Sequence, residues 1–118
     1  MNNEHFAVMG AGEVGFHLAR QLSQDGHSVV VIELDPEKRD RVQESLDVSV
    51  VLGNGAHAPV LEAAGIAQCD LFVAVSSSDE ANLAAAVLAK HLGARRTVVR
   101  VNVADDVTVH RQIGRAHV

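Results

Sequence analysis

Aromatic residues and cysteine are scarce in this chain. It holds three phenylalanines but no tryptophan or tyrosine among its 118 residues, so the stacked aromatic platforms that bind single-stranded nucleic acid have no side chains to form them. A formal net charge of -5 also disfavours a nucleic-acid-binding surface, which normally carries a basic stripe. The one cysteine, Cys69, cannot form a disulfide within the chain, and nothing indicates an oxidising compartment.

Long hydrophobic runs are missing as well. The longest apolar stretches, Ser28–Ile32 and Asp70–Val75, have the length of a β-strand and fall short of the roughly 18 to 20 residues that a membrane-spanning helix needs. The N-terminal MNNEHF lacks the basic region and apolar core of a signal peptide. These absences lead us to expect a cytoplasmic protein that does not insert into a membrane. Because no Pro/Gly/Ser-rich linker divides the chain, we expect one domain over residues 1–118.

Two kinds of segment alternate along the sequence. Short runs of continuous apolar character predict parallel strands that are buried on both faces: Phe6–Met9, Ser28–Ile32, Val48–Leu52, Leu71–Val75 and Thr97–Val101. Helical spacing predicts helices between and after them: Val14–Leu22, Pro36–Ser45, Ala58–Ala64, Asp79–Leu92 and, more weakly, Asp105–Ile113. This alternation predicts an α/β fold, a Rossmann-like doubly wound parallel sheet in three layers. We expect the domain to be truncated where a sixth strand begins, near His117–Val118.

A glycine motif joins the first strand to the first helix. In AVMGAGEVGFHLARQL, residues 7–22, three glycines stand at G-x-G-x-x-G spacing. Gly10 allows the tight turn, Gly12 lets the backbone approach a diphosphate, and Gly15 lets the helix pack closely on the sheet. The helix N-terminus adds unpaired N–H groups and a partial positive charge. The loop, including Ala11, Glu13 and Val14, is therefore predicted to bind the phosphates of a nucleotide. The less favoured alternative is a glycine-rich turn without a ligand.

A carboxylate follows the second strand. Glu33 ends the run VVVIE roughly 20 residues beyond the glycines, where it can accept hydrogen bonds from both ribose hydroxyls of an adenosine. The same charge would repel a 2′-phosphate, which disfavours an NADP-type ligand. We expect this side chain at a surface crevice, so that Glu33→Gln weakens binding while the fold survives. Asp35 either assists Glu33 or caps the helix that starts at Pro36. Glu13 would repel a terminal phosphate, which favours a dinucleotide or ADP over ATP.

The carboxyl ends of the other strands complete the predicted crevice. Residues after the third strand are expected along the adenine ring: Gly53, Asn54, Gly55 and Ala56. Residues after the fourth strand either meet a ribose or phosphate or cap the next helix: Val75, Ser76, Ser77, Ser78 and Asp79. The fifth strand ends with Arg100 and Asn102, and Arg100 is the cation that we place near the crevice.

Catalytic and metal sites have little support. Seven histidines are scattered over the elements without metal-ligand spacing. Cys69 has no CxxC or nearby histidine partner and is expected to be a buried, inert thiol, and the serines lack a G-x-S-x-G elbow. The nucleotide fold also uses nearly the whole chain, which leaves no region to hold a substrate. We therefore expect a non-catalytic domain without a metal, with a fragment of a nicotinamide-dependent oxidoreductase as the alternative.

As a whole, the sequence resembles the N-terminal nucleotide-binding lobe of the potassium-transport regulators. These are the Trk/Ktr regulatory subunits, a family also called the regulator-of-conductance-of-potassium domain. The resemblance runs from about Phe6 to Val118, and its most specific parts are GNGAHAPVLEAAGI and AVSSSDEANLAAAVLAK. It implies a cytoplasmic sensor, peripheral to the inner membrane, that forms a homodimer or a higher ring. Such a sensor gates a membrane-embedded potassium channel or transporter. The cytoplasmic tail of a cation–proton antiporter is the alternative.

The resemblance also implies a ligand and its contacts. The expected ligand is NAD or NADH, with ADP, ATP or AMP as alternatives. Gly10, Gly12 and Gly15 would hold the phosphates and Glu33 the ribose. The region after the fourth strand would face the nucleotide or a neighbouring lobe, and it contributes Ser76, Asp79, Glu80 and Asn82. Arg100 would lie near the far end of the ligand.

Two departures from the family pattern stand out, and one further expectation concerns assembly. Glu13 stands where some members carry a basic residue, and the C-terminal lobe that often follows is missing. The alanine-rich Asp79–Leu92 helix, or the Asp105–Ile113 helix, is a candidate for a homodimer interface. The simpler interpretation is that the small residues of Asp79–Leu92 only let that helix pack on the sheet.

Overall fold

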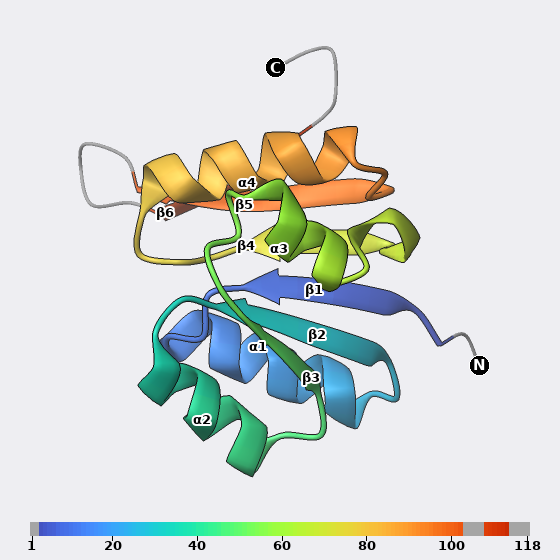
Figure 1. Ribbon diagram of the computed structural model, residues 1–118, viewed down its shortest axis with the longest axis vertical. Helices are drawn as coiled ribbons and strands as arrows, with labels where there is room; N and C mark the ends of the chain where they lie inside the picture. The colour runs from blue at the N-terminus through green and yellow to red at the C-terminus, as the bar shows by residue number, and fades with distance from the viewer. Residues whose placement is uncertain (1–2, 103–107, 114–118) are drawn as a thin grey trace.

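The protein is built around a six-stranded sheet in the order β3-β2-β1-β4-β5-β6 (Figure 1). The computed structural model describes residues 3–102 and 108–113. Five strands run parallel and the sixth runs antiparallel to the fifth. Their bounds are β1 His5–Met9, β2 Ser28–Glu33, β3 Ser49–Leu52, β4 Leu71–Ala74, β5 Arg96–Asn102 and β6 Thr108–Ile113. The chain moves outward from β1 through β2 and β3 and then crosses back to β4, so the strand order reverses between β1 and β4.

Helices cover both faces of this sheet, as the doubly wound fold requires (Figure 1). One face carries α1 (Glu13–Gln24) and α2 (Pro36–Ser45). The other carries α3 (Ala58–Ala63), the short 3-10 helix η1 (Ile66–Gln68) and α4 (Asp79–His91). The Rossmann-like three-layer arrangement predicted from the sequence is confirmed. Within the described residues, no helix has both the length and the hydrophobicity that crossing a bilayer requires.

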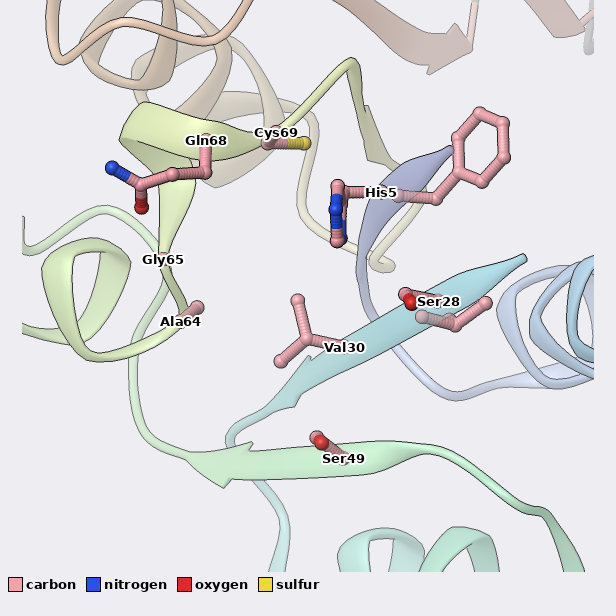
Figure 2. Close-up of a pocket in the computed structure, with 10 residues that line it drawn as sticks. His5, Ser28, Val30, Ser49, Ala64, Gly65, Gln68 and Cys69 are labelled. Atoms are coloured by element: carbon pink, nitrogen blue, oxygen red, sulfur yellow. The ribbon is translucent and has the colours of Figure 1, made fainter. Parts of the chain in front are cut away.

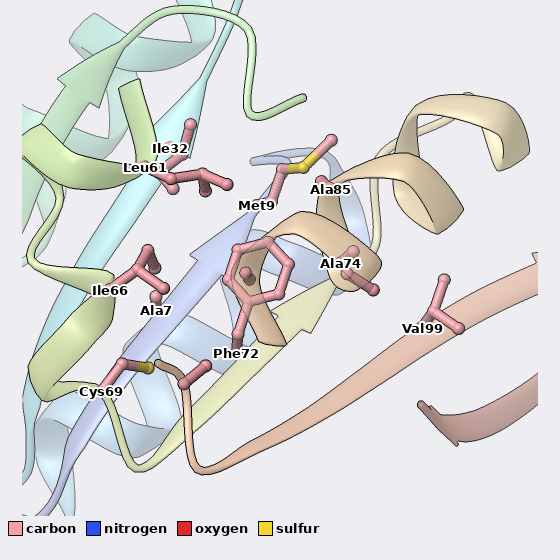
Figure 3. Packing of buried hydrophobic residues seen from close by; sticks show 13 residues of the cluster. Ala7, Met9, Ile32, Leu61, Ile66, Cys69, Phe72, Ala74, Ala85 and Val99 are labelled. Atoms are coloured by element: carbon pink, nitrogen blue, oxygen red, sulfur yellow. The ribbon is translucent and has the colours of Figure 1, made fainter. Parts of the chain in front are cut away.

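Side chains of each strand alternate between two cores. Beneath α3 and α4, Phe72 of β4 packs with Leu61 and Ile66, all fully buried (Figure 3). The inner face of α4 is made of alanines, Ala85 and Ala86 among them, which lets the helix lie close to the sheet. The second core lies beneath α1 and α2 and contains Val8, Phe16, Ala19, Val31 and Val42. Because both faces are covered, the strands read as continuous apolar runs in the sequence.

Local chemistry sets where the helices begin and end. The Asp35 carboxylate accepts a hydrogen bond from the Glu37 amide at 3.1 Å, and Pro36 follows at the first helical position. The Ser78 hydroxyl accepts from the Ala81 amide at 3.1 Å and caps α4 in the same way. Gly93 follows α4 with φ +118°, a conformation that L side chains rarely adopt.

The helix that the sequence predicted over Asp105–Ile113 is wrong where the structure describes this segment. Thr108–Ile113 forms β6, which pairs antiparallel with β5 along its length. The β-branched Thr108 and Val109 disfavour a helix, and the backbone groups at the edge of β5 take partners from a strand instead. Residues 105–107 and the expected start of a further strand at His117–Val118 lie outside the described residues.

Candidate functional site

A cavity of about 710 Å³ opens at the carboxyl ends of the parallel strands, where the strand order reverses. The glycine loop between β1 and α1 forms its centre. The ends of β2 and β3 with the start of α2 form one side, and the loop after β4 with the end of β5 forms the other. Its lining consists of Met9, Gly10, Ala11, Gly12, Glu13, Val14, Ile32, Glu33, Leu34, Asp35, Lys38, Gly53, Asn54, Gly55, Val75, Ser76, Ser77, Ser78, Ala81 and Arg100. A volume of this size accommodates a nucleotide.

The three glycines of the loop meet different surroundings. Gly10 has φ +104°, and a Cβ there would lie 2.7 Å from the backbone of Ser76. A Cβ on Gly15 would overlap the carbonyl oxygen of Gly10. Gly12 has an ordinary φ of -74°, and a Cβ there would meet no atom within 4 Å. The fold therefore requires glycine at Gly10 and Gly15, whereas the open space over Gly12 leaves room for a ligand's phosphate.

The N-terminus of α1 faces this open space. Gly12 is the N-cap and provides no side-chain cap, and the first helical hydrogen bond runs from the Phe16 amide to the Gly12 carbonyl at 2.9 Å. The amides that precede it have no helical acceptor, and the helix dipole adds positive potential. The Glu13 side chain is 83% exposed, with its carboxylate 3.6 Å from His17 Nε2 one turn further on. Glu13 also belongs to the cavity lining, so its charge lies near the mouth of the cavity.

Glu33 is more buried than the sequence indicated. It lines the crevice where the sequence placed it, but only 8% of the residue is exposed. Its Oε1 accepts from the Ala11 amide at 2.6 Å, and its Oε2 accepts from the Asp35 amide at 2.8 Å. The carboxylate thus connects the glycine loop to the start of α2. Each oxygen has a further lone pair, and the residue lines the cavity, so ribose hydroxyls can still donate to it.

Across the cavity, Ser76 and Arg100 are tied to the buried Asn82. Its Oδ1 accepts from the Ser76 amide at 3.0 Å and from the Ser76 hydroxyl at 2.6 Å. Its Nδ2 donates to the carbonyl oxygens of Ser76 at 2.9 Å and Arg100 at 3.2 Å. The carboxylate of Asp79 accepts from the Asn102 amide at 3.2 Å. Hydrogen bonds between distant segments therefore shape this side of the cavity.

The cavity brings together most of the residues predicted from the sequence. The predicted residues that lie outside the lining are Gly15, Ala56, Asp79, Glu80 and Asn82. Asp35 lines the cavity and also caps α2. The capping role that the sequence offered as one alternative is therefore confirmed.

Sequence reasoning did not name five residues of the lining, Met9, Ile32, Leu34, Lys38 and Ala81. Two of them present an exposed or charged side chain. Leu34 is 67% exposed, and Lys38 is a second cation beside the cavity besides Arg100. Leu34 directly follows Glu33, and Lys38 comes three residues after the N-cap Asp35. These positions in the sequence could have indicated that both side chains lie near the cavity.

A second, smaller cavity of about 250 Å³ lies at the opposite end of the strands, where β1, β2 and β3 begin. Figure 2 shows His5, Ser28 and Ser49 from the starts of three strands, with Gln68 and Cys69 across from them. The Cys69 thiol donates to the Leu71 carbonyl at 2.9 Å, and burial raises its pKa to about 11, so it is a neutral thiol near pH 7. Within the described part of the chain, no three His, Cys, Asp or Glu side chains are placed to hold a metal.

Comparison of the sequence with known proteins identifies its relatives. The family model described as the TrkA-N domain matches residues 6–118. The Trk system potassium uptake protein TrkA homolog of Archaeoglobus fulgidus is 46% identical over 94 residues, 80% of this chain and 21% of that protein. A homolog of the same name from Methanothermobacter thermautotrophicus is 35% identical over 114 residues, 97% of this chain and 53% of that protein. The chain thus spans about a fifth of the first relative and about half of the second.

Solved structures resemble it as well. The TrkA-N domain of the inner membrane protein ybaL from Escherichia coli has a TM-score of 0.75 at 24% identity, covering 90% of this chain and 78% of that one. The GsuK channel bound to NAD gives 0.71 at 20% identity, covering 83% and 18%. The Shewanella denitrificans Kef CTD in AMP bound form gives 0.65 at 25% identity, covering 75% and 52%. The first two likenesses concern the fold alone.

Proposed function

Because the chain belongs to the TrkA-N domain family, we propose that it is a regulatory domain of potassium transport that binds an adenine nucleotide. The ligand is NAD or NADH, with ADP, ATP and AMP as alternatives, and it occupies the 710 Å³ cavity. Its relatives are named as potassium uptake proteins. The NAD-bound GsuK channel and the AMP-bound Kef domain, which share the fold, support this class of ligand.

The open space over Gly12 is the observation that carries the proposal. Gly10 and Gly15 are explained by contacts within the protein, whereas a Cβ on Gly12 would meet nothing within 4 Å. A diphosphate placed there accepts hydrogen bonds from the free amides at the start of α1 and lies at the positive end of its dipole. Glycine at this position then serves the ligand and not the fold.

The cavity's two sides set the orientation of the ligand. Glu33 accepts from the hydroxyls of the adenosine ribose, and the adenine lies along residues 53–56 after β3. The second half of a dinucleotide extends over the loop after β4 toward Arg100. The buried Glu33 charge disfavours a 2′-phosphate, which favours NAD over NADP.

Calorimetry of the purified chain with NAD, NADH, ADP, ATP and AMP tests this proposal. We expect binding with a dissociation constant on the order of micromolar, about -8 kcal/mol, and the tightest binding for NAD or NADH. Absence of heat and of thermal stabilisation with all five nucleotides would refute nucleotide binding. The domain does no chemistry on its ligand, so NADH absorbance stays constant in the presence of carbonyl compounds. A steady fall in absorbance would favour the oxidoreductase alternative instead.

The nucleotide acts on transport through the arrangement of assembled domains. A ligand shifts a gate only as far as its affinity differs between the two arrangements. The domain lies in the cytoplasm against a membrane-embedded potassium channel or transporter subunit and forms a homodimer or a ring.

The outer face of α4 supplies a surface for this assembly. There Leu83 is 42% and Val87 is 60% exposed, one helical turn apart, while the inner face is filled with buried alanines. In sedimentation experiments, Val87→Glu is expected to shift the protein toward monomer. Gln43→Glu, on the exposed surface of α2, serves as the matched control and leaves the distribution unchanged. An unaltered distribution with Val87→Glu would remove α4 from the interface.

A further inference from the structure

Asn82 is a fully buried polar side chain that holds two segments of the cavity wall. It lies at the end of the first turn of α4 with none of its surface exposed. Its amide group uses both acceptor and both donor positions, in the bonds to Ser76 and Arg100 described above. The orientation of the amide follows from its partners, since an N–H and a hydroxyl face the oxygen and two carbonyls face the nitrogen.

The residues that Asn82 holds belong to one half of the cavity. Ser76 and Arg100 line the side formed by β4 and β5, while Glu33 and Asn54 line the side formed by β2 and β3. The glycine loop lies between the two halves. Asn82 itself does not line the cavity. A mononucleotide fills the Glu33 half and the glycine loop, whereas a dinucleotide extends across to the half that Asn82 organises.

We propose that Asn82 is a positioning residue that gives the cavity its preference for a dinucleotide over a mononucleotide, although it never touches the ligand. This inference rests on the nucleotide binding proposed above. Through one amide group, Asn82 holds the loop after β4 and the end of β5 in place before the ligand arrives. A ligand that reaches Ser76 and Arg100 then does not have to order them on binding, a cost that would otherwise reduce its affinity.

The geometry requires asparagine here. An aspartate keeps the acceptor for the Ser76 amide but turns a charged oxygen toward the carbonyls of Ser76 and Arg100, which need a donor. A serine is too short to reach both segments at once. Either replacement removes the side-chain bonds that join Ser76 to the Arg100 carbonyl, although Asp79 still accepts from the Asn102 amide. The bonds of Glu33 on the other side of the cavity are left in place.

Paired titrations with NAD and AMP test the inference. We expect Asn82→Asp and Asn82→Ser to weaken NAD binding by about tenfold and AMP binding by less than about twofold, so the NAD-to-AMP affinity ratio falls. Ala86→Gly is the matched control, because it weakens the same helix at a buried position without any side-chain bond to the cavity wall. Its NAD-to-AMP ratio stays that of the wild type. A purely structural role for Asn82 would lower both affinities together and leave the ratio unchanged.

Each outcome has one meaning. If the wild type binds neither nucleotide, the proposed function itself fails. If it binds both and the Asn82 variants keep the wild-type ratio, or if it binds AMP as tightly as NAD, only the present inference fails. Should both variants fail to fold, hydrogen exchange of the wild type decides. The Ser76 amide is expected to be protected before NAD is added, and an unprotected amide would overturn the inference.

Discussion

Gly12→Ala should separate ligand binding from folding. A Cβ at this position meets no protein atom within 4 Å, and the backbone φ of -74° suits alanine. The new methyl group projects into the space where we place the diphosphate. The variant is therefore expected to fold like the wild type and to lose most of its affinity for nucleotides.

The magnitudes support a clean separation. Replacing glycine at a compatible site restricts the unfolded chain and stabilises the fold by about 0.4–1 kcal/mol. Alanine is a poorer N-cap than glycine by about 0.5–1 kcal/mol, which offsets that gain. The melting temperature is thus expected to stay within about 4 °C of the wild type. A methyl group between the amides and the phosphates is expected to weaken binding about tenfold to hundredfold, or about 1.4–2.7 kcal/mol.

Thermal unfolding and calorimetry with NAD measure the two effects on the same sample. Gly15→Ala is the contrasting variant, because its Cβ overlaps the Gly10 carbonyl oxygen. It should lose about 1–3 kcal/mol of stability from overpacking. A Gly12→Ala protein that binds NAD as tightly as the wild type would refute the placement of the diphosphate. An unfolded Gly12→Ala protein would refute the claim that the fold does not require this glycine.

Three further predictions concern groups whose surroundings the structure defines. Glu33→Gln is expected to weaken NAD binding and also to lower the free energy of unfolding by about 1–3 kcal/mol, because one backbone amide would then face an NH₂ group. Urea unfolding at constant pH measures that loss, and an unaltered midpoint would contradict it. The Cys69 thiol, with its pKa raised by burial to about 11, is expected to react with a chromogenic disulfide reagent at pH 8 far more slowly than in the urea-unfolded chain. Equal rates would show it to be accessible. The hydrogen bond from the His5 amide lowers the pKa of Asp70, and Arg95 adds to the effect. The ionised carboxylate therefore stabilises the fold at pH values above the unfolded-state pKa of about 3.9. This stabilisation is lost as the pH falls through the lower pKa of the folded state. The stability advantage over Asp70→Asn should therefore shrink in acid, and a constant difference from pH 7 to pH 2 would contradict this.

The predictability of the fold follows the range of the interactions involved. The helix Pro36–Ser45 was predicted with its observed bounds, because Asp35 caps it and Pro36 opens it within the same few residues. The helix predicted over Asp105–Ile113 was wrong for Thr108–Ile113, since that segment takes its hydrogen bonds from β5. No local pattern reveals that partner.

The same distinction applies to the candidate site. The glycine spacing and Glu33 are visible in the sequence because the proposed nucleotide site is built around a turn of neighbouring residues and one carboxylate. The burial of Glu33 and the link from Asn82 to Arg100 are not visible, because they join segments 22 and 18 residues apart. Which glycine the fold requires and which one faces open space also depends on such neighbours.

Amino-acid order alone thus determined the alternation of strands and helices, the helix caps and the glycine turn after β1, since each depends on backbone preferences and contacts within a few residues. Tertiary structure decided that Gly12 faces open space while Gly10 and Gly15 are enclosed. It also decided that a buried amide on α4 holds the far wall of the cavity. These features arise only when the sheet brings the ends of β1, β4 and β5 together, because atoms distant along the chain then come within hydrogen-bonding or steric range.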